Sequence, residues 1–252
     1  MKTQPESETV DTILGGRLRI VQPLCGYRVS VDAVLLARFA RPRGRDRVLD
    51  LGAGCGAVSL IIAALEHPRE VVAVEIQPEL AAMAARGATL NQLANVTCLS
   101  ADLRGPIDGL APGSFDYVVA NPPYRASGTG RESPDPGRRI ARGGSGASLA
   151  EFVSAASRYA AHGAKAAFVF TAARSAELIA ELKAQALEPK RIRFVHPRRA
   201  TAATTILVEA RKDGGVEAEV EPPLFLYTAP GVYSDEAHEL LGEPADGPVV
   251  RG

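Results

Sequence analysis

Residues 48–65 read VLDLGAGCGAVSLIIAAL, and this stretch decides the fold. A short apolar run at 48–52 predicts a buried strand, and the apolar spacing over 57–65 predicts a helix. The glycine-rich turn between them lets the backbone approach a ligand and leaves the N-terminus of the helix open. Its third glycine comes one position too early for the G-x-G-x-x-G dinucleotide fingerprint, and the turn lacks the Gly-Lys-Ser/Thr ending of a phosphate loop. It therefore indicates a binding turn of another kind.

Strands and helices continue to alternate after this stretch. The apolar patterns predict strands at 71–76, 96–101, 115–120 and 164–170, and helices at 78–93, 148–161 and 174–187. They also predict a closing antiparallel strand pair at 191–197 and 204–210. Strands that alternate with helices form parallel sheets, because each crossover returns the chain to the same edge. The prediction is an α/β fold with a doubly wound, mostly parallel seven-stranded sheet that ends in an antiparallel pair.

The two ends of the chain differ from this middle part. A β-hairpin is predicted over 13–29 and a helix over 31–40, with Ser30 as a candidate N-cap. From Asp213 onward there are nine acidic residues and one basic residue, a net charge of −8 in a chain of net charge zero, so the rest carries +8. We expect three parts, namely an N-terminal hairpin and helix packed on the core (1–40), the main domain (41–212) and an acidic C-terminal extension (213–252).

Composition narrows the class of protein. Hydrophobic residues make up 46% and charged residues 23% of the chain, which is typical of a globular protein. The three cysteines are widely spaced and form no C-x-x-C, which argues against a disulfide framework and a structural zinc site. The first twelve residues are polar, and no apolar run is long enough to span a membrane. A cytoplasmic protein without a metal or a membrane partner is the expectation, and the oligomeric state is left open.

Two acidic residues stand where successive predicted strands end. Glu75 follows the second parallel strand, where an acid in such sheets accepts hydrogen bonds from ribose hydroxyls. Asp102 follows the third strand, where it can accept from an adenine amino group. Because the carboxyl ends of parallel strands meet at one edge of the sheet, these acids and the glycine turn predict a pocket for a nucleoside ligand.

After the fourth parallel strand comes Asn121-Pro122-Pro123-Tyr124. With the Asp-x-Gly-x-Gly-x-Gly run at 50–56 and the two acids, this turn resembles the class I S-adenosylmethionine-dependent amino-group methyltransferases, which have a Rossmann-like fold. Within them the chain is most similar to the bacterial tRNA(Val) adenine-N6-methyltransferase family, from about Leu14 to Glu209. The resemblance implies an enzyme of RNA modification that takes S-adenosylmethionine and methylates N6 of a tRNA adenine in the anticodon loop.

The resemblance also implies roles for single residues. Asp50, Gly52 and Gly54 should line the methionine part of the cofactor, and Glu75 should hold its ribose hydroxyls. A further set should complete the cofactor site, with Asp102 and Leu103 flanking the adenine and Asn121 beside the methyl group. Asp32 either closes the pocket near the cofactor's amino group or is a simple first-turn helix acid.

The chemistry explains the residue types of the turn. An adenine amine is a poor nucleophile because its lone pair is delocalised into the ring. Asn121 Oδ1 and the Pro122 carbonyl can accept its two hydrogens and direct the lone pair at the methyl group. The prolines make the turn rigid, Tyr124 offers a face for stacking the base, and Pro123 is expected to contact the substrate. Asn121, Pro122 and Tyr124 are the catalytic candidates. They are expected to act by positioning and electrostatics, so no metal is required.

Arginines predict a nucleic-acid partner. The segment 125–147 has no apolar periodicity and contains five arginines, of which Arg125, Arg138 and Arg139 are substrate-binding candidates. A second group near the closing strand pair is also expected to favour phosphates; it consists of Arg191, Arg193, His196, Arg198 and Arg199.

Other functions remain open from the residues alone. The glutamine-N5-methyltransferases of release factors share the four-residue turn, because their target is also a planar amide nitrogen. The arginine-rich segment favours RNA over that protein target. DNA adenine and ribosomal RNA guanine are weaker alternatives, and a non-catalytic RNA-binding module is a different class. The intact Asn121 argues against the last reading.

Overall fold

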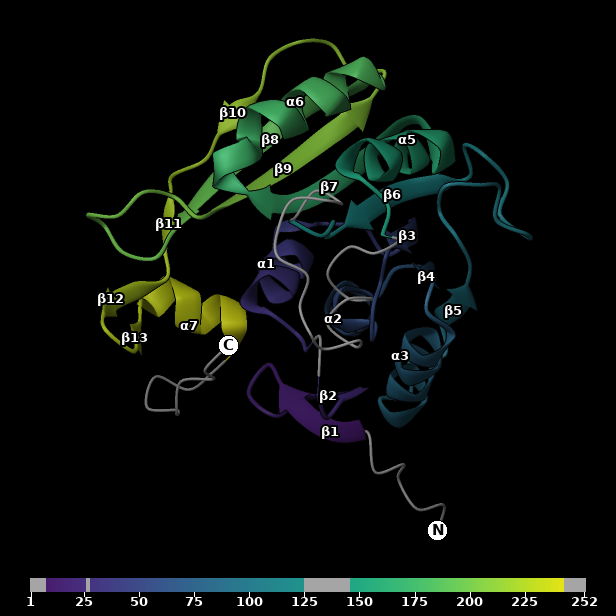
Figure 1. Cartoon of the computed structure of the whole chain (residues 1–252), viewed down its shortest axis with the longest axis horizontal. Helices are drawn as coiled ribbons and strands as arrows, with labels where there is room; N and C mark the ends of the chain where they lie inside the picture. The colour runs from purple at the N-terminus through teal and green to yellow at the C-terminus, as the bar shows by residue number, and fades with distance from the viewer. Residues whose placement is uncertain (1–7, 26–27, 125–145, 243–252) are drawn as a thin grey trace.

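The computed structural model describes residues 8–25, 28–124 and 146–242. Its centre is one sheet whose seven long strands run in the order β5-β4-β3-β6-β7-β9-β8 (Figure 1). Those strands are β3 (Arg47–Leu51), β4 (Glu70–Glu75), β5 (Val96–Ser100), β6 (Phe115–Ala120), β7 (Ala160–Thr171), β8 (Leu187–His196) and β9 (Thr205–Lys212). Strand β9 is antiparallel to both β7 and β8, and the other neighbouring pairs among the seven are parallel. The predicted sheet, with its closing antiparallel pair, is confirmed.

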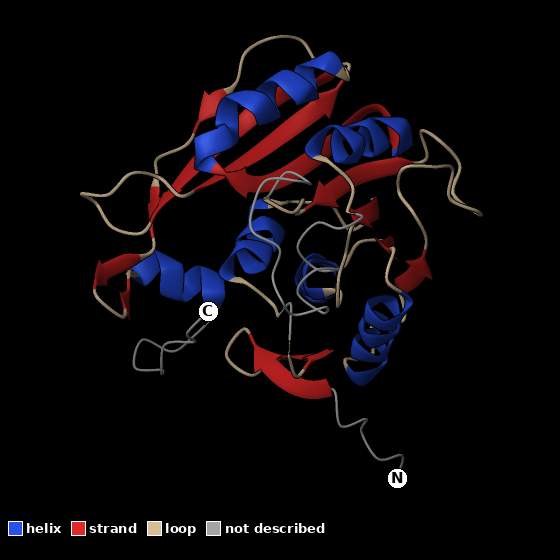
Figure 2. Cartoon of the chain, in the orientation of Figure 1, coloured by secondary structure: helices blue, strands red, loops and turns tan. Residues whose placement is uncertain are grey.

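Helices cover both faces of this sheet (Figure 2). Alternate strand residues enter two separate apolar layers, as the pleat requires. Val48 and Val71 belong to the layer shared with α1 (Val31–Phe39), α2 (Ala57–Glu66) and α3 (Pro78–Leu90). Leu49 and Val72, one residue further on, belong to the layer shared with α5 (Leu149–Tyr159) and α6 (Ser175–Ala184). The near-continuous apolar strands of the sequence are thus buried on both sides.

The N-terminal hairpin lies earlier in the chain than predicted. Its strands are β1 (Glu8–Ile13) and β2 (Leu18–Pro23), joined by a turn through the glycine pair Gly15-Gly16. The prediction of 13–29 is wrong at its start, because the polar stretch 8–13 has no apolar alternation of its own and is ordered by pairing with β2. Gln22 then links the hairpin to the rest, since its Oε1 accepts a hydrogen bond from the backbone N–H of Val29 at 2.9 Å.

The acidic C-terminal part also packs on the core. Two short strands, β10 (Glu219–Val220) and β11 (Leu224–Phe225), pair in parallel with β8 and extend the sheet to nine strands. They are followed by a small hairpin and α7 (Asp235–Leu241), which contacts α1; the hairpin strands are β12 (Tyr227–Ala229) and β13 (Val232–Tyr233). Leu224, Tyr233 and Leu241 are buried in the α1–α2 layer. Among the described helices, none has the length and apolar character to cross a membrane.

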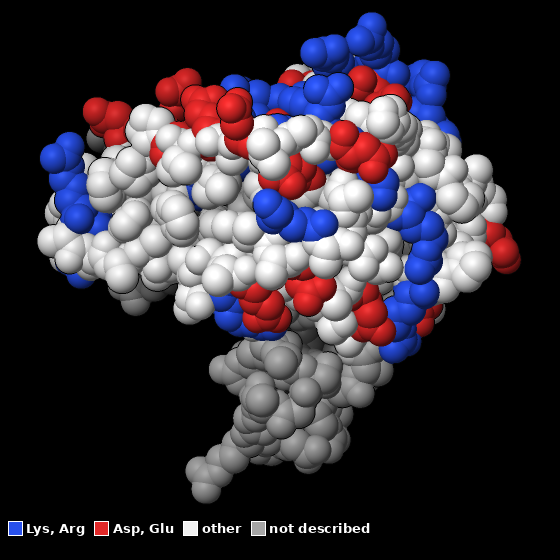
Figure 3. Space-filling view, turned by 90° about the horizontal axis from the view of Figure 1, so that it is seen from above, with Lys and Arg blue, Asp and Glu red and all other residues white. Residues whose placement is uncertain are grey.

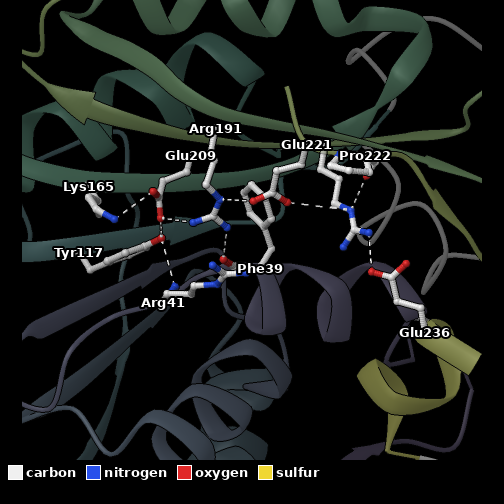
Figure 4. A network of polar contacts seen from close by, with 10 residues as sticks. Phe39, Arg41, Tyr117, Lys165, Arg191, Glu209, Glu221, Pro222 and Glu236 are labelled. Atoms are coloured by element: carbon white, nitrogen blue, oxygen red, sulfur yellow. Dashed lines mark hydrogen bonds and ion pairs between the residues drawn. The ribbon is translucent and has the colours of Figure 1, made fainter. Parts of the chain in front are cut away.

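A network of charged groups around the buried Glu209 ties this part to the sheet (Figure 4). Glu209 on β9 accepts a hydrogen bond from the Tyr117 hydroxyl and pairs with Lys165 Nζ at 3.0 Å and Arg191 Nη1 at 3.3 Å. Arg191 Nε pairs in turn with Glu221 at 2.7 Å, next to β10. Glu221, an acid of the C-terminal part, thus compensates the charge of Arg191 on the central sheet.

Candidate functional site

A cavity of about 310 Å³ opens at the carboxyl edge of the parallel strands. Its walls come from the start of α1, the β3–α2 turn, the ends of β4 and β5, and the turn after β6. The described lining residues include four acids, Asp32, Asp50, Glu75 and Asp102, and no Lys, Arg or His. The cavity therefore has a negative wall, which favours a cationic ligand and disfavours a phosphate or pyrophosphate group.

The β3–α2 turn needs its glycines. Gly52, Gly54 and Gly56 all have positive φ, at 69°, 57° and 84°. A Cβ on Gly52 would lie 2.8 Å from the ring of Phe152 on α5, and a Cβ on Gly56 would lie 2.7 Å from Ala84 Cβ on α3. Close packing and the left-handed backbone thus explain the predicted run, and Gly52 and Gly54 line the cavity as expected.

Asp50 lies at the base of this turn and is almost fully buried. Its Oδ2 accepts hydrogen bonds from Ser59 Oγ at 2.6 Å and from Ser59 N at 3.1 Å. Burial raises the pKa of the Asp50 carboxyl to about 7, the charge of Glu75 adds to the rise, and the Ser59 hydrogen bonds oppose it. Within the described part of the chain no cation pairs with Asp50. The carboxyl is therefore near its titration point at neutral pH.

Glu75 ends β4 and is only 7% exposed. Its Oε2 accepts from the backbone N–H of Gly54 at 2.9 Å, and its Oε1 accepts from that of Gln77 at 3.0 Å. These two bonds fix the carboxylate between the glycine turn and the start of α3. The structure thus places Glu75 on the cavity wall, beside Gly54, as the sequence predicted.

Asp102 and Leu103 form the wall after β5. Arg104 binds both Asp102 oxygens through Nε, at 3.0 and 2.9 Å, and its guanidinium holds the pKa of Asp102 below the usual range. Leu103 is buried at the same edge, and Ile76, which is 45% exposed, also lines the cavity. Sequence reasoning missed Ile76, since nothing in a strand end distinguishes an apolar residue that contacts a ligand from one in the core. It also missed Phe152, whose apolar helix spacing predicts only burial.

The Asn-Pro-Pro-Tyr turn follows β6 and forms the opposite wall. Asn121 is half-buried, Pro122 is buried, and Pro123 is exposed. All four residues of the turn line the cavity. Among the residues that the structure describes, none is hydrogen-bonded to the Asn121 side-chain amide, so its oxygen is free of them to accept from a ligand amine. Tyr124 donates its hydroxyl to Asp32 Oδ2 at 2.5 Å.

The predicted phosphate contacts divide into three cases. Arg125, Arg138 and Arg139 lie outside the described residues. Arg191 and Arg193 are engaged by Glu221 and Glu236, so the prediction that they contact phosphates is wrong. The reason is the packing of the C-terminal part, which the sequence did not specify.

The other members of the second group, His196, Arg198 and Arg199, lie in and beside the β8–β9 turn. This turn is at the carboxyl edge of the sheet. Arg198 and Arg199 are exposed there. Neither forms an ion pair with any described residue. His196 Nδ1 is hydrogen-bonded to the Thr201 carbonyl at 2.8 Å. On the face seen in Figure 3, basic and acidic side chains are interspersed. The two exposed arginines, and not the whole group, thus remain candidates for phosphate contact.

Within the described ranges, no cluster of His, Cys, Asp and Glu could hold a metal ion. The candidate site is therefore an acidic cavity with two uncharged side-chain amides, Gln77 and Asn121, at its wall. The Gln77 amide donates to Glu75 Oε1 at 3.4 Å, which leaves Asn121 as the amide that no described residue engages. Such a set of groups can bind a cationic nucleoside ligand and hold a planar amine next to it.

Comparisons with known proteins agree with this geometry. Residues 30–135 match the family model described as methyltransferase small domain. A curated relative from Shewanella amazonensis is 38% identical over 119 residues, which cover 47% of this chain and 49% of that protein. A second, from Aeromonas hydrophila, is 26% identical over 218 residues, or 86% of this chain and 89% of that protein. Both are named tRNA1(Val) (adenine(37)-N6)-methyltransferase. The first match spans about half the length of its relative.

Solved structures give the same fold. A predicted O-methyltransferase of Agrobacterium tumefaciens superimposes with a TM-score of 0.66 at 27% identity, covering 83% of this chain and 94% of that one. The geranyl diphosphate C-methyltransferase of Streptomyces coelicolor, in a complex that contains S-adenosyl-L-homocysteine, has a TM-score of 0.54 over 71% of this chain and 79% of its own. At 13% identity, the second likeness shows the fold alone.

Proposed function

We propose that the chain is a class I methyltransferase that uses S-adenosylmethionine to methylate N6 of an adenine in the anticodon loop of a tRNA. The match of residues 30–135 to the methyltransferase small domain, the curated relatives and the shared fold support this proposal. The observation that carries the proposal is the position of Asn121. Its amide stands at the end of β6, on the wall of the acidic cavity, without a hydrogen-bond partner among the described residues. A polar group held in this way is suited to a ligand's amine.

The cavity fits the cofactor. S-adenosylmethionine supplies an electrophilic methyl group on a positively charged sulfonium. A wall with four acids, of which only Asp102 is paired with a described cation, Arg104, complements that charge. Glu75 would hold the ribose hydroxyls with its carboxylate, which the N–H groups of Gly54 and Gln77 already orient. Asp102, Leu103 and Ile76 would flank the adenine. Asp50, Gly52 and Gly54 would line the methionine part.

The turn would then prepare the acceptor. Asn121 Oδ1 and the Pro122 carbonyl would accept the two hydrogens of the base's amine and keep its lone pair directed at the methyl group. Tyr124 would hold the base by stacking, with Pro123 as an exposed neighbour that contacts the nucleotide. These roles need no charged catalyst, since positioning a poor nucleophile and stabilising the positive charge that develops on its nitrogen suffice.

The RNA part of the proposal rests on the relatives and on arginine. The names of both curated relatives given above specify a tRNA adenine. The exposed Arg198 and Arg199 at the carboxyl edge supply phosphate contacts on the side where the cavity opens. Arg125, Arg138 and Arg139, placed by sequence next to the catalytic turn, are proposed to extend this surface.

One experiment tests the function against its alternatives. The protein is incubated with methyl-labelled S-adenosylmethionine and, separately, with total tRNA, a peptide-chain release factor and plasmid DNA. We expect label in tRNA, recovered as N6-methyladenosine after digestion to nucleosides. Label in the release factor would support glutamine-N5 methylation instead, and cofactor binding without transfer to any of the three would favour a binding module. Asn121→Ala is the matched negative control.

A further inference from the structure

Asp32 and Tyr124 meet across the cavity although 92 positions separate them in the chain. Asp32 lies in the first turn of α1, and Tyr124 closes the turn after β6. The Tyr124 hydroxyl donates to Asp32 Oδ2 at 2.5 Å, a charge-assisted hydrogen bond. The second oxygen, Oδ1, accepts from Thr205 Oγ1 at 3.3 Å, at the start of β9. The Asp32 carboxylate thus connects α1 to the Asn-Pro-Pro-Tyr turn and to β9.

Two further contacts restrain the same tyrosine. Its ring packs edge-to-face on Phe170 of β7, with centroids 5.7 Å apart and planes at 87°. Its backbone carbonyl accepts from Arg174 Nη1 at 2.9 Å, at the end of the short 3₁₀ helix η1 (Ala172–Arg174). Arg174 is itself fixed by an ion pair with Glu177 and by lying 4.8 Å from the centroid of the Phe170 ring. The backbone and the ring are therefore anchored from β7 and η1, and the hydroxyl from α1.

From this arrangement we propose that Asp32 is a positioning residue, which acts through the Tyr124 hydroxyl to hold the ring in the orientation that receives the target base. The proposal rests on the proposed function, since it takes Tyr124 as the stacking platform. Phe170 packs against the ring, and Arg174 holds the backbone of the tyrosine. The hydrogen bond from the hydroxyl to Asp32 restrains the far end of the ring before the base arrives, so binding has less of the side chain to order.

The observed contact also separates two roles for Asp32. If the carboxylate served the cofactor alone, its loss would weaken cofactor binding and leave the tyrosine unaffected. If it serves the tyrosine, its loss should weaken use of the RNA and leave the affinity for S-adenosylhomocysteine unchanged. The hydrogen bond to the hydroxyl supports the second role.

Kinetics provide the first test. Asp32→Ala, Tyr124→Phe and the double variant are compared for kcat and KM with tRNA, and for the affinity of S-adenosylhomocysteine. Each single change should lower kcat/KM for tRNA about tenfold, because both break the same hydrogen bond and release the ring. The double variant should be no worse than the poorer single variant. Asp32→Asn keeps an acceptor oxygen and should recover part of the loss.

Fluorescence provides a second test that needs neither cofactor nor RNA. The chain has six tyrosines and no tryptophan, so tyrosine emission can be observed directly. A carboxylate that accepts from a phenol quenches its emission, because the excited phenol transfers its proton. Asp32→Ala should therefore raise the tyrosine emission, and the same change in a Tyr124→Phe background should leave it unaltered. This result judges the contact even if the substrate is not tRNA.

The matched control is Glu79→Gln. Glu79 is also an acid in the first turn of a helix, α3, and it is exposed. It should change neither the kinetics nor the emission. Additive losses in the double variant, a lost affinity for S-adenosylhomocysteine in Asp32→Ala, or unchanged emission in that variant would each overturn the proposal. If Asp32→Ala fails to fold, Asp32→Asn and Tyr124→Phe carry the same comparison.

Discussion

The cavity and the ion-pair network of the central sheet are both built on buried carboxylates, but they compensate charge in opposite ways. In the network, Glu209 pairs with Lys165 and Arg191, and Arg191 also pairs with Glu221 (Figure 4). In the cavity, the described residues supply no cation to Asp50 or Glu75. Their hydrogen bonds come from a serine, from the Gln77 side-chain amide and from backbone N–H groups.

The difference separates structural acids from acids kept for a ligand. A buried carboxylate without a cation is costly in free energy, and at Asp50 the cost appears as a pKa raised to about 7. A cationic ligand at the cavity wall would offset it. In the network, side chains of the protein itself compensate the charge of Glu209. The same ion pairs attach the C-terminal part to the sheet.

The largest expected effect is on stability, and it compares one substitution in the two regions. Glu209→Gln removes a buried charge that faces Arg191 and Lys165, so it should lower the free energy of unfolding by about 3 kcal/mol. Glu75→Gln removes a buried charge with no described partner cation, but its single amide oxygen can accept from only one of the N–H groups of Gly54 and Gln77. It should lower the free energy of unfolding by about 1 kcal/mol, less than Glu209→Gln. Urea unfolding of both variants measures these changes in the free energy of unfolding. Equal decreases in the two variants would contradict the distinction between the two regions.

Asn121→Ala should act on the reaction and not on the fold. Losing one of the two acceptors for the amine should slow single-turnover methyl transfer roughly 10²–10³-fold, by analogy with losing one oxyanion-hole donor. The affinity for S-adenosylhomocysteine should stay the same, and Asn121→Asp should retain more activity than alanine.

The structure offers a matched asparagine for this test. Asn91 uses its amide to bind the backbone of Arg19 and Gly87, so Asn91→Ala should lower stability and leave the transfer rate unchanged. A wild-type rate in Asn121→Ala would refute the role given to the turn.

A smaller effect is expected from pH. The raised pKa means that folding favours the protonated Asp50, so this group opposes folding as the pH rises from about 4 to about 7. A cationic cofactor has the opposite preference and binds the ionised carboxylate. Affinity for S-adenosylmethionine should therefore rise about tenfold between pH 6 and pH 8 and be accompanied by proton release. Calorimetry in buffers of different ionisation enthalpy measures both. Asp50→Asn should remove the pH dependence of the affinity. If the affinity of this variant still rises with pH, another group is responsible for the dependence.

The smallest effect distinguishes exposed arginines from those in the network. Replacing Arg198 and Arg199 by alanine should weaken tRNA binding and reduce the slope of log affinity against log salt by about 0.7 to 0.9 per lost phosphate contact. The matched control replaces Arg43 and Arg45, which are exposed at the opposite edge of the sheet, before β3. Equal changes in both double variants would mean that the RNA contact is non-specific.

The sequence predicted the site residues correctly where their position at the end of a strand is enough to place them. The apolar runs and the glycine turn predicted the parallel sheet, and parallel strands bring their carboxyl ends together. Asp50, Glu75 and Asn121 were therefore placed at one edge before any contact was known, and the structure puts all three on the cavity wall.

Contacts between distant segments could not be predicted in this way. The bond from Tyr124 to Asp32 joins two elements with no shared pattern. The pairing of Arg191 with Glu221 depends on β10, a strand of two residues whose order comes only from its neighbour β8. The expected arginine surface shrank for this reason, since local sequence does not reveal which charges the fold itself will neutralise.

A calorimetric titration of the wild-type protein with S-adenosylmethionine and, separately, with NAD tests the role of the cavity most directly. The acidic cavity, whose Asp50 and Glu75 have no described partner cation, predicts micromolar binding of the cationic cofactor, about −8 kcal/mol, and no binding of the anionic dinucleotide. Tight binding of NAD with no response to S-adenosylmethionine would contradict both the role of the cavity and the proposed reaction.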